Sequence, residues 1–119
     1  MELLPYQQQV LDDLADFLRQ LEQCGNLKDA FRAFWHQRSV ARPEPYYPSI
    51  PRVPHVCIKV PTGGGKTFIA ANAIHTVFEA LNIYRRDAPR AVVWLVPSNA
   101  ILDQTLNALS DPSHPYRRK

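Results

Sequence analysis

One short segment of the chain has the composition of a phosphate-binding loop. It reads Val60-Pro61-Thr62-Gly63-Gly64-Gly65-Lys66-Thr67. Glycine has no Cβ and adopts backbone conformations that let successive N–H groups point at phosphate oxygens. Lys66 adds a positive charge for the β- and γ-phosphates, and the hydroxyl of Thr67 is a natural ligand for Mg²⁺. We therefore expect residues 62–67 to bind ATP or a close relative, with Lys66 and Thr67 in the catalytic roles.

The segment departs from the usual G-x-x-x-x-G-K-[ST] pattern at one position. Val60 stands where that pattern has its first glycine. This position precedes the part of the loop that wraps the phosphates, so we interpret the departure as minor. The alternative is a Gly-rich turn in which Lys66 is merely solvated, and the flanking residues argue against it.

The flanking residues predict a strand before the loop and a helix after it. Residues 55–60 are mostly apolar, which is typical of a buried strand. Residues 68–81 carry apolar side chains at helical spacing, at positions 69, 70, 73, 74, 77, 78 and 81. The loop would thus join a strand to a helix N-terminus, where free N–H groups and the helix dipole favour an anion.

Residues 1–38 are predicted to form a helical lead-in. An amphipathic helix is expected over residues 6–23, ended by Gly25, and Asn26 can cap a second, shorter helix. Residues 39–54 are a proline-rich loop, since five prolines in twelve residues exclude a helix or a central strand. Tyr46 and Tyr47 within this loop could stack on a base, but we favour packing over the domain edge.

After the helix at 68–81, a second buried strand is predicted over residues 91–96. Pro97 ends it, and either Ser98 or Asn99 can cap a helix that runs to about Leu109. Residues 55–109 would then form a phosphate-loop α/β unit, and residues 110–119 a frayed tail. Strand, loop, helix, strand and helix in this order predict the start of a parallel α/β sheet.

Length and composition limit the chain to one small globular domain. It has 119 residues, 45% of them hydrophobic, and a net charge of +3 that the basic residues at 117–119 equal by themselves. Cys24 and Cys57 have no metal-ligand spacing, so we expect reduced thiols in a cytoplasmic protein. The absence of a leader pattern and of a long apolar stretch predicts no membrane segment.

Three segments together resemble superfamily 2 helicases and translocases. Residues 59–67 resemble their motif I, which commonly reads Pro-Thr-Gly-x-Gly-Lys-Thr, and residues 92–105 look like motif Ia, a strand that ends in proline before Leu-x-x-Gln. Tyr6 and Gln7 are similar to the Tyr-Gln element that precedes motif I. The triple glycine, the proline-rich lead-in and the tryptophan in motif Ia most resemble the ATPase (Res) subunit of type III restriction enzymes.

The resemblance implies a fold, a set of ligands and residue roles. The fold would be an incomplete RecA-like domain that binds ATP and Mg²⁺ and belongs to a protein that moves along DNA. Tyr6 and Gln7 would contact adenine, and Pro97, Ser98 and Asn99 would grip the DNA phosphate backbone. A methyltransferase subunit and a nuclease activity are the further features that such a restriction enzyme implies.

The resemblance also implies parts that these residues lack. Hydrolysis in this family needs an acidic pair at the end of an apolar strand and arginine fingers from a second RecA-like domain. The predicted strand at 91–96 ends without a carboxylate, and Asp12 and Asp13 lie on a solvated helix face. We therefore expect nucleotide binding rather than hydrolysis by residues 1–119 alone. A nucleotide-binding fragment without activity and a small phosphate-loop kinase remain the alternatives.

Overall fold

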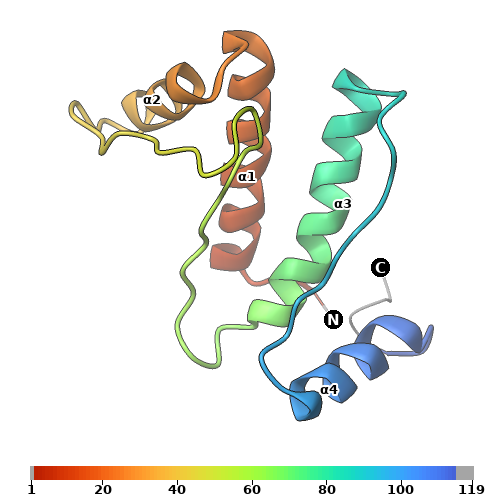
Figure 1. Ribbon diagram of the computed structural model, residues 1–119. Helices are drawn as coiled ribbons and strands as arrows, with labels where there is room; N and C mark the ends of the chain where they lie inside the picture. Colours follow the sequence, from red (N-terminus) through yellow and green to blue (C-terminus); the bar gives the residue numbers. More distant parts are fainter. Residues whose placement is uncertain (1, 115–119) are drawn as a thin grey trace.

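The computed structural model describes residues 2–114, and these fold into four helices; a short turn at Gly25 and Asn26 joins the first two, and longer loops join the others. The helices are α1 (Pro5–Cys24), α2 (Leu27–Gln37), α3 (Lys66–Tyr84) and α4 (Asn99–Ser110). Helices α1 and α3 lie side by side, α2 packs against one end of α1, and α4 lies near the first turn of α3 (Figure 1). The first turn of α3 therefore lies where three parts of the chain meet.

Local capping signals set the ends of the helices as the sequence predicts. Gly25 ends α1 in the left-handed conformation, with φ of 76°. The Asn26 side chain accepts a 2.9 Å hydrogen bond from the backbone N–H of Asp29 at the start of α2. The Ser98 hydroxyl accepts one of 3.3 Å from the N–H of Ile101 at the start of α4. The four predicted helices are thus confirmed, with ends within a few residues of those expected.

Helix α1 is central to the core, because it packs against both α2 and α3. Leu11, Leu14 and Phe17 from α1 are buried, as are Phe68 and Ile69 from the first turn of α3. Burying such side chains is worth roughly 1.5–3 kcal/mol each. The packing therefore places the N-terminal turn of α3 firmly against α1.

An ion cluster fixes the end of α2 to α1. The Arg38 guanidinium pairs with Asp13 and with Asp16 at 2.7 Å each, and it lies 3.7 Å above the centre of the Phe34 ring. Burial lowers the pKa of Arg38, but hydrogen bonds and charge interactions with the two carboxylates outweigh this and raise it above its ordinary value. Asp13 is thus an ion-pair partner, not only part of a solvated face.

The predicted α/β fold is wrong for the described residues. Residues 2–114 contain helices and no strand, and the two predicted strands, 55–60 and 91–96, are elongated coil (Figure 1). A strand is defined by backbone hydrogen bonds to a neighbouring strand, and neither segment has such a neighbour among these residues. The apolar pattern showed which side chains seek an apolar surface, but it could not supply a pairing partner.

The consequence for side-chain burial is visible along both segments. Cys57 was expected inside a buried strand, and it is exposed; it and Cys24 are free thiols. Val93 and Leu95 keep 84% and 88% of their surface exposed.

Among the described residues, no helix is both long and apolar enough to cross a membrane.

Candidate phosphate-binding site

The glycine run forms a tight turn that leads directly into α3. The N–H of Gly64 donates a 2.9 Å hydrogen bond to the carbonyl oxygen of Pro61. Gly63 and Gly65 both have left-handed φ values, of 78° and 79°, which residues with a Cβ rarely adopt. Helix α3 begins at the next residue, Lys66. The predicted order of loop and helix is confirmed.

Backbone donors are available where the loop meets the helix. Within the described residues, the N–H groups of Gly65, Lys66 and Thr67 donate no hydrogen bond. The first N–H groups of a helix have no partner inside it, and together with the helix dipole they favour an anion. By contrast, the N–H of Gly64 is already bonded within the turn, so it is not one of the free donors in this conformation.

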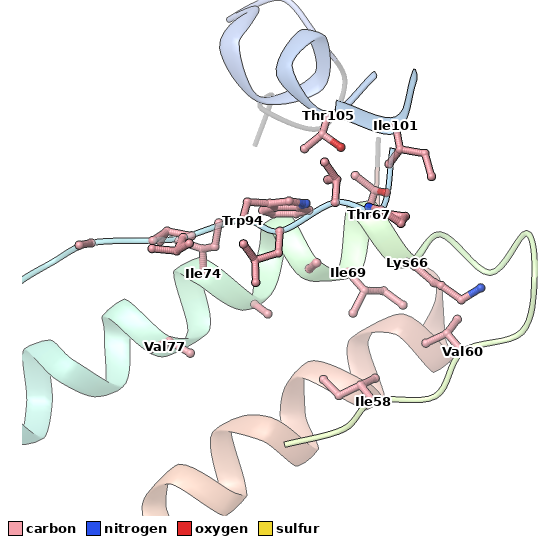
Figure 2. Close-up of a pocket in the computed structure, with 18 of the residues that line it drawn as sticks. Ile58, Val60, Lys66, Thr67, Ile69, Ile74, Val77, Trp94, Ile101 and Thr105 are labelled. Carbon is pink, nitrogen blue, oxygen red and sulfur yellow. The ribbon is translucent and has the colours of Figure 1, made fainter. Parts of the chain in front are cut away.

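Lys66 and Thr67 extend to different sides of the first turn of α3 (Figure 2). Lys66 is exposed, and no salt bridge holds its ammonium group among the described residues. Thr67 is half-buried and lines a hollow shared with Ile101 and Thr105 of α4. The lysine is free to reach a ligand, and the threonine faces α4, in which the predicted motif Ia ends.

Tyr6 and Gln7 come together with the loop, although they lie almost sixty residues earlier in the chain. The Tyr6 hydroxyl donates a 2.6 Å hydrogen bond to the carbonyl oxygen of Gly64, and the Gln7 amide donates one of 3.1 Å to the same atom. The other end of the Gln7 amide accepts a 2.9 Å hydrogen bond from the N–H of Leu4. Gln7 is the third residue of α1, and this bond is one half of a capping box.

The loop is packed too closely for side chains at two of its glycines. A Cβ on Gly64 would overlap Cγ1 of Val60 and lie 2.9 Å from the carbonyl oxygen of Pro61. A Cβ on Gly65 would lie 2.5 Å from Nε2 of Gln7. The departure from the usual pattern at Val60 is therefore part of the packing, because its side chain occupies the space that glycine leaves at position 64. The sequence pattern gave no sign of this contact.

An apolar groove of about 840 Å³ runs along α3 from this turn. One wall is formed by residues 91–97, including Trp94, and Ile58 and Val60 lie at its other side (Figure 2). Among residues 2–114, no carboxylate lines this groove or the hollow beside Thr67. Mg²⁺ usually takes one or two carboxylates together with substrate phosphates, and these linings offer it only neutral oxygens, of which the Thr67 hydroxyl lies next to the loop. The free N–H groups of the loop are therefore well suited to the phosphates of a nucleotide, whereas the oxygens in these linings are poorly suited to Mg²⁺.

Pro97, Ser98 and Asn99 form an exposed corner at the start of α4. Ser98 is the cap residue of the helix, so its hydroxyl oxygen already accepts one backbone hydrogen bond. Within the described residues, the N–H groups of Asn99 and Ala100 have no acceptor. The corner therefore presents backbone donors and small polar side chains but no cationic side chain.

Of the two tyrosines in the proline-rich loop, Tyr46 packs against the helices as we expected, and Tyr47 does not. Tyr46 contacts the Phe31 ring with centroids 5.4 Å apart, and its hydroxyl accepts a 2.6 Å hydrogen bond from the N–H of His55. Tyr47 is exposed. The Tyr46 ring holds the loop against α2 and is not available for stacking on a base.

Comparison with known families gives one match over the whole chain. A family described as type III restriction enzyme, res subunit, matches residues 1–119. Searches of curated proteins and of solved structures found no significant match. The matched range includes the glycine loop, the Tyr6–Gln7 pair and the corner at the start of α4.

Proposed function

Because the chain belongs to the family of type III restriction enzyme res subunits, we propose that it is the ATP-binding segment of a DNA helicase or translocase. The observation that carries this proposal is the run of free N–H groups at residues 65–67, at the start of a helix and beside the unpaired Lys66. Free amides at such a position are suited to the oxygens of a triphosphate.

The backbone and the side chains of the loop have different roles in the proposal. The N–H groups of Gly65, Lys66 and Thr67 bind phosphate oxygens, and Gly63 and Thr62 shape the turn that precedes them. The Lys66 ammonium neutralises charge on the β- and γ-phosphates. The Thr67 hydroxyl is the ligand that this chain offers to Mg²⁺, an ion that would neutralise further phosphate charge when bound.

These residues are proposed to bind nucleotide, with hydrolysis needing groups that they do not include. Water must be oriented and transition-state charge stabilised for phosphoryl transfer, and both tasks need additional acidic or cationic side chains. No carboxylate lines the surfaces next to Thr67 among the described residues. Residues 1–119 alone are therefore expected to bind ATP without measurable turnover.

DNA is the proposed second ligand, bound at the corner formed by Pro97, Ser98 and Asn99. Backbone N–H groups and hydroxyls at a helix N-terminus contact phosphates and carry no base information. Thr67 and Ile101 line the same hollow, so the proposed DNA site lies next to the nucleotide loop. A methyltransferase subunit as partner is proposed from the family alone.

The proposal is tested by measuring the binding of MgATP to the chain by titration calorimetry. Lys66→Ala should lower the affinity at least tenfold, because it removes the charge next to the phosphates. Lys28→Ala is the matched control, since Lys28 is equally exposed but lies on α2. Equal affinities for all three proteins, or no binding by the unsubstituted chain, would refute the proposed function.

A further inference from the structure

The carbonyl oxygen of Gly64 is held by two side chains from the first turn of α1. The donors are the Tyr6 hydroxyl, at 2.6 Å, and the Gln7 amide, at 3.1 Å. Gln7 is 5% exposed, and its amide oxygen is bonded to the N–H of Leu4. The Gln7 side chain therefore has a fixed orientation, and the oxygen of Gly64 is tied to a rigid helix end.

Fixing this carbonyl also fixes the neighbouring N–H group. The peptide bond between Gly64 and Gly65 is planar and trans, so the C=O and the following N–H point in opposite directions. When Tyr6 and Gln7 hold the oxygen, the N–H of Gly65 must point away from them. That N–H is the first of the three free donors at the start of α3.

The close packing of Gln7 against the loop strengthens this link. A Cβ on Gly65 would approach Nε2 of Gln7 to 2.5 Å, which means that the amide lies directly on the loop backbone. Glycines at left-handed φ on both sides of Gly64 would otherwise allow the peptide to rotate. The two α1 side chains thus restrict the most flexible part of the loop.

We propose that Tyr6 and Gln7 are positioning residues for the triphosphate, which act through the Gly64 carbonyl and independently of the base. The inference deepens the proposed function and rests on it. It differs from the expectation that these residues contact adenine, because a triphosphate without any base should depend on them equally. Neither residue needs to touch the nucleotide to have this effect.

The test compares MgATP with inorganic tripolyphosphate and Mg²⁺ in calorimetric titrations of the chain. Tyr6→Phe and Gln7→Ala each remove one donor to Gly64. Each should lower the affinity for both ligands by the same factor, about fivefold for the loss of one hydrogen bond. Matched controls are Tyr47→Phe and Gln8→Ala, because Tyr47 is exposed and the Gln8 side chain donates to Asp12 and not to the loop. Both controls should bind like the unsubstituted chain.

A second readout needs no ligand. In the nucleotide-free protein, the amide NMR signal of Gly65 should shift in Tyr6→Phe and stay in place in Tyr47→Phe. Circular dichroism shows whether each variant is folded. If Gln7→Ala is not, the test still stands on Tyr6→Phe, which removes only one exposed hydroxyl.

Three results would overturn the inference, and they are distinguishable. A loss confined to ATP, with tripolyphosphate binding unchanged, would show adenine contact alone. An unshifted Gly65 signal together with unchanged affinities would show that the hydrogen bonds to Gly64 do not determine the conformation of the loop. If the unsubstituted chain bound neither ligand, the proposed function itself would fail, and the inference with it.

Discussion

The Tyr6 hydroxyl donates a 2.6 Å hydrogen bond to the carbonyl oxygen of Gly64, a residue 58 positions later in the chain. Through this bond the first turn of α1 reaches the loop that precedes α3. Helices α1 and α3 pack against each other, and both carry buried apolar side chains. The geometry of the loop therefore depends on the α1–α3 contact as well as on its own glycines.

Substituting Gly65 should weaken nucleotide binding through a clash with Gln7 as well as through backbone strain. Gly65→Ala places a Cβ at φ of 79° and at 2.5 Å from Nε2 of Gln7. We expect the free energy of unfolding to fall by about 1–2 kcal/mol and the affinity for MgATP to fall at least tenfold. Chemical denaturation and calorimetry measure the two quantities.

Gly25→Ala is the matched control for that substitution. Gly25 has φ of 76°, but a Cβ there would have no neighbour within 4 Å. It should therefore lower stability by a similar amount and leave nucleotide binding unchanged. If the Gly65→Ala protein bound MgATP normally, the loop would keep its function even when the new Cβ pushes the Gln7 side chain aside.

Replacing both Ser98 and Asn99 by alanine should weaken DNA binding by a similar factor for unrelated sequences. Phosphate contacts position a protein on the duplex without reading bases. Fluorescence anisotropy with two duplexes of different sequence, at one fixed salt concentration, measures the effect. A loss limited to one duplex would mean that this corner reads bases.

Loss of the helix cap must be separated from loss of DNA contact in that experiment. Ser98 caps α4, and removing such a cap costs about 1 kcal/mol. Asn26→Ala removes the equivalent cap of α2 and should lower stability similarly without changing DNA binding.

The helices and the loop were predictable because their signals are local. Asn26, Ser98 and Gly25 act on the three or four residues next to them, and apolar spacing marked the buried apolar residues of α1. The predicted strands at 55–60 and 91–96 needed partners from elsewhere in the chain, and the described residues contain none. An apolar run of six residues says nothing about whether such a partner exists.

The anchoring of the loop was not predictable for a related reason. Tyr6 and Gln7 stood out through a family resemblance, and their expected target was adenine. Their hydrogen bonds to Gly64 arise from the packing of α1 on α3, which brings the two helix N-termini together. The close approach of the Val60 side chain to Gly64 arises instead from the local turn, whose geometry the sequence pattern does not reveal.

The Arg38 cluster should contribute measurably to stability. Arg38→Ala removes two ion pairs and the contact with the Phe34 ring. We expect a loss of about 1–2 kcal/mol in the free energy of unfolding. Hydrogen bonds between charged groups stabilise a fold more than neutral ones do, but the partial exposure of these side chains to water weakens their interaction. Urea denaturation measures it. Arg32→Ala, at an exposed position on α2, should change stability little. If both variants lost the same free energy of unfolding, the ion pairs of Arg38 would not be the cause.

The coil at 91–96 should promote self-association and broaden the thermal unfolding of residues 1–119. Val93 and Leu95 are highly exposed, and exposed apolar side chains beside unpaired backbone groups favour contact with another chain. Replacing both by threonine should lower the associated fraction in sedimentation velocity. Ile83→Thr is the control, because Ile83 is exposed on α3 outside this segment. Equal association in all variants would place the contact elsewhere.

The most direct test of the account is to follow the backbone amides of the chain by NMR while MgATP is added. If the loop binds the triphosphate, the signals of Gly65, Lys66 and Thr67 should show the largest shifts, and those of α2 should stay in place. Saturable binding with the largest shifts at α2 or in the proline-rich loop, or no shift at residues 65–67, would contradict the assignment of this loop as the nucleotide site.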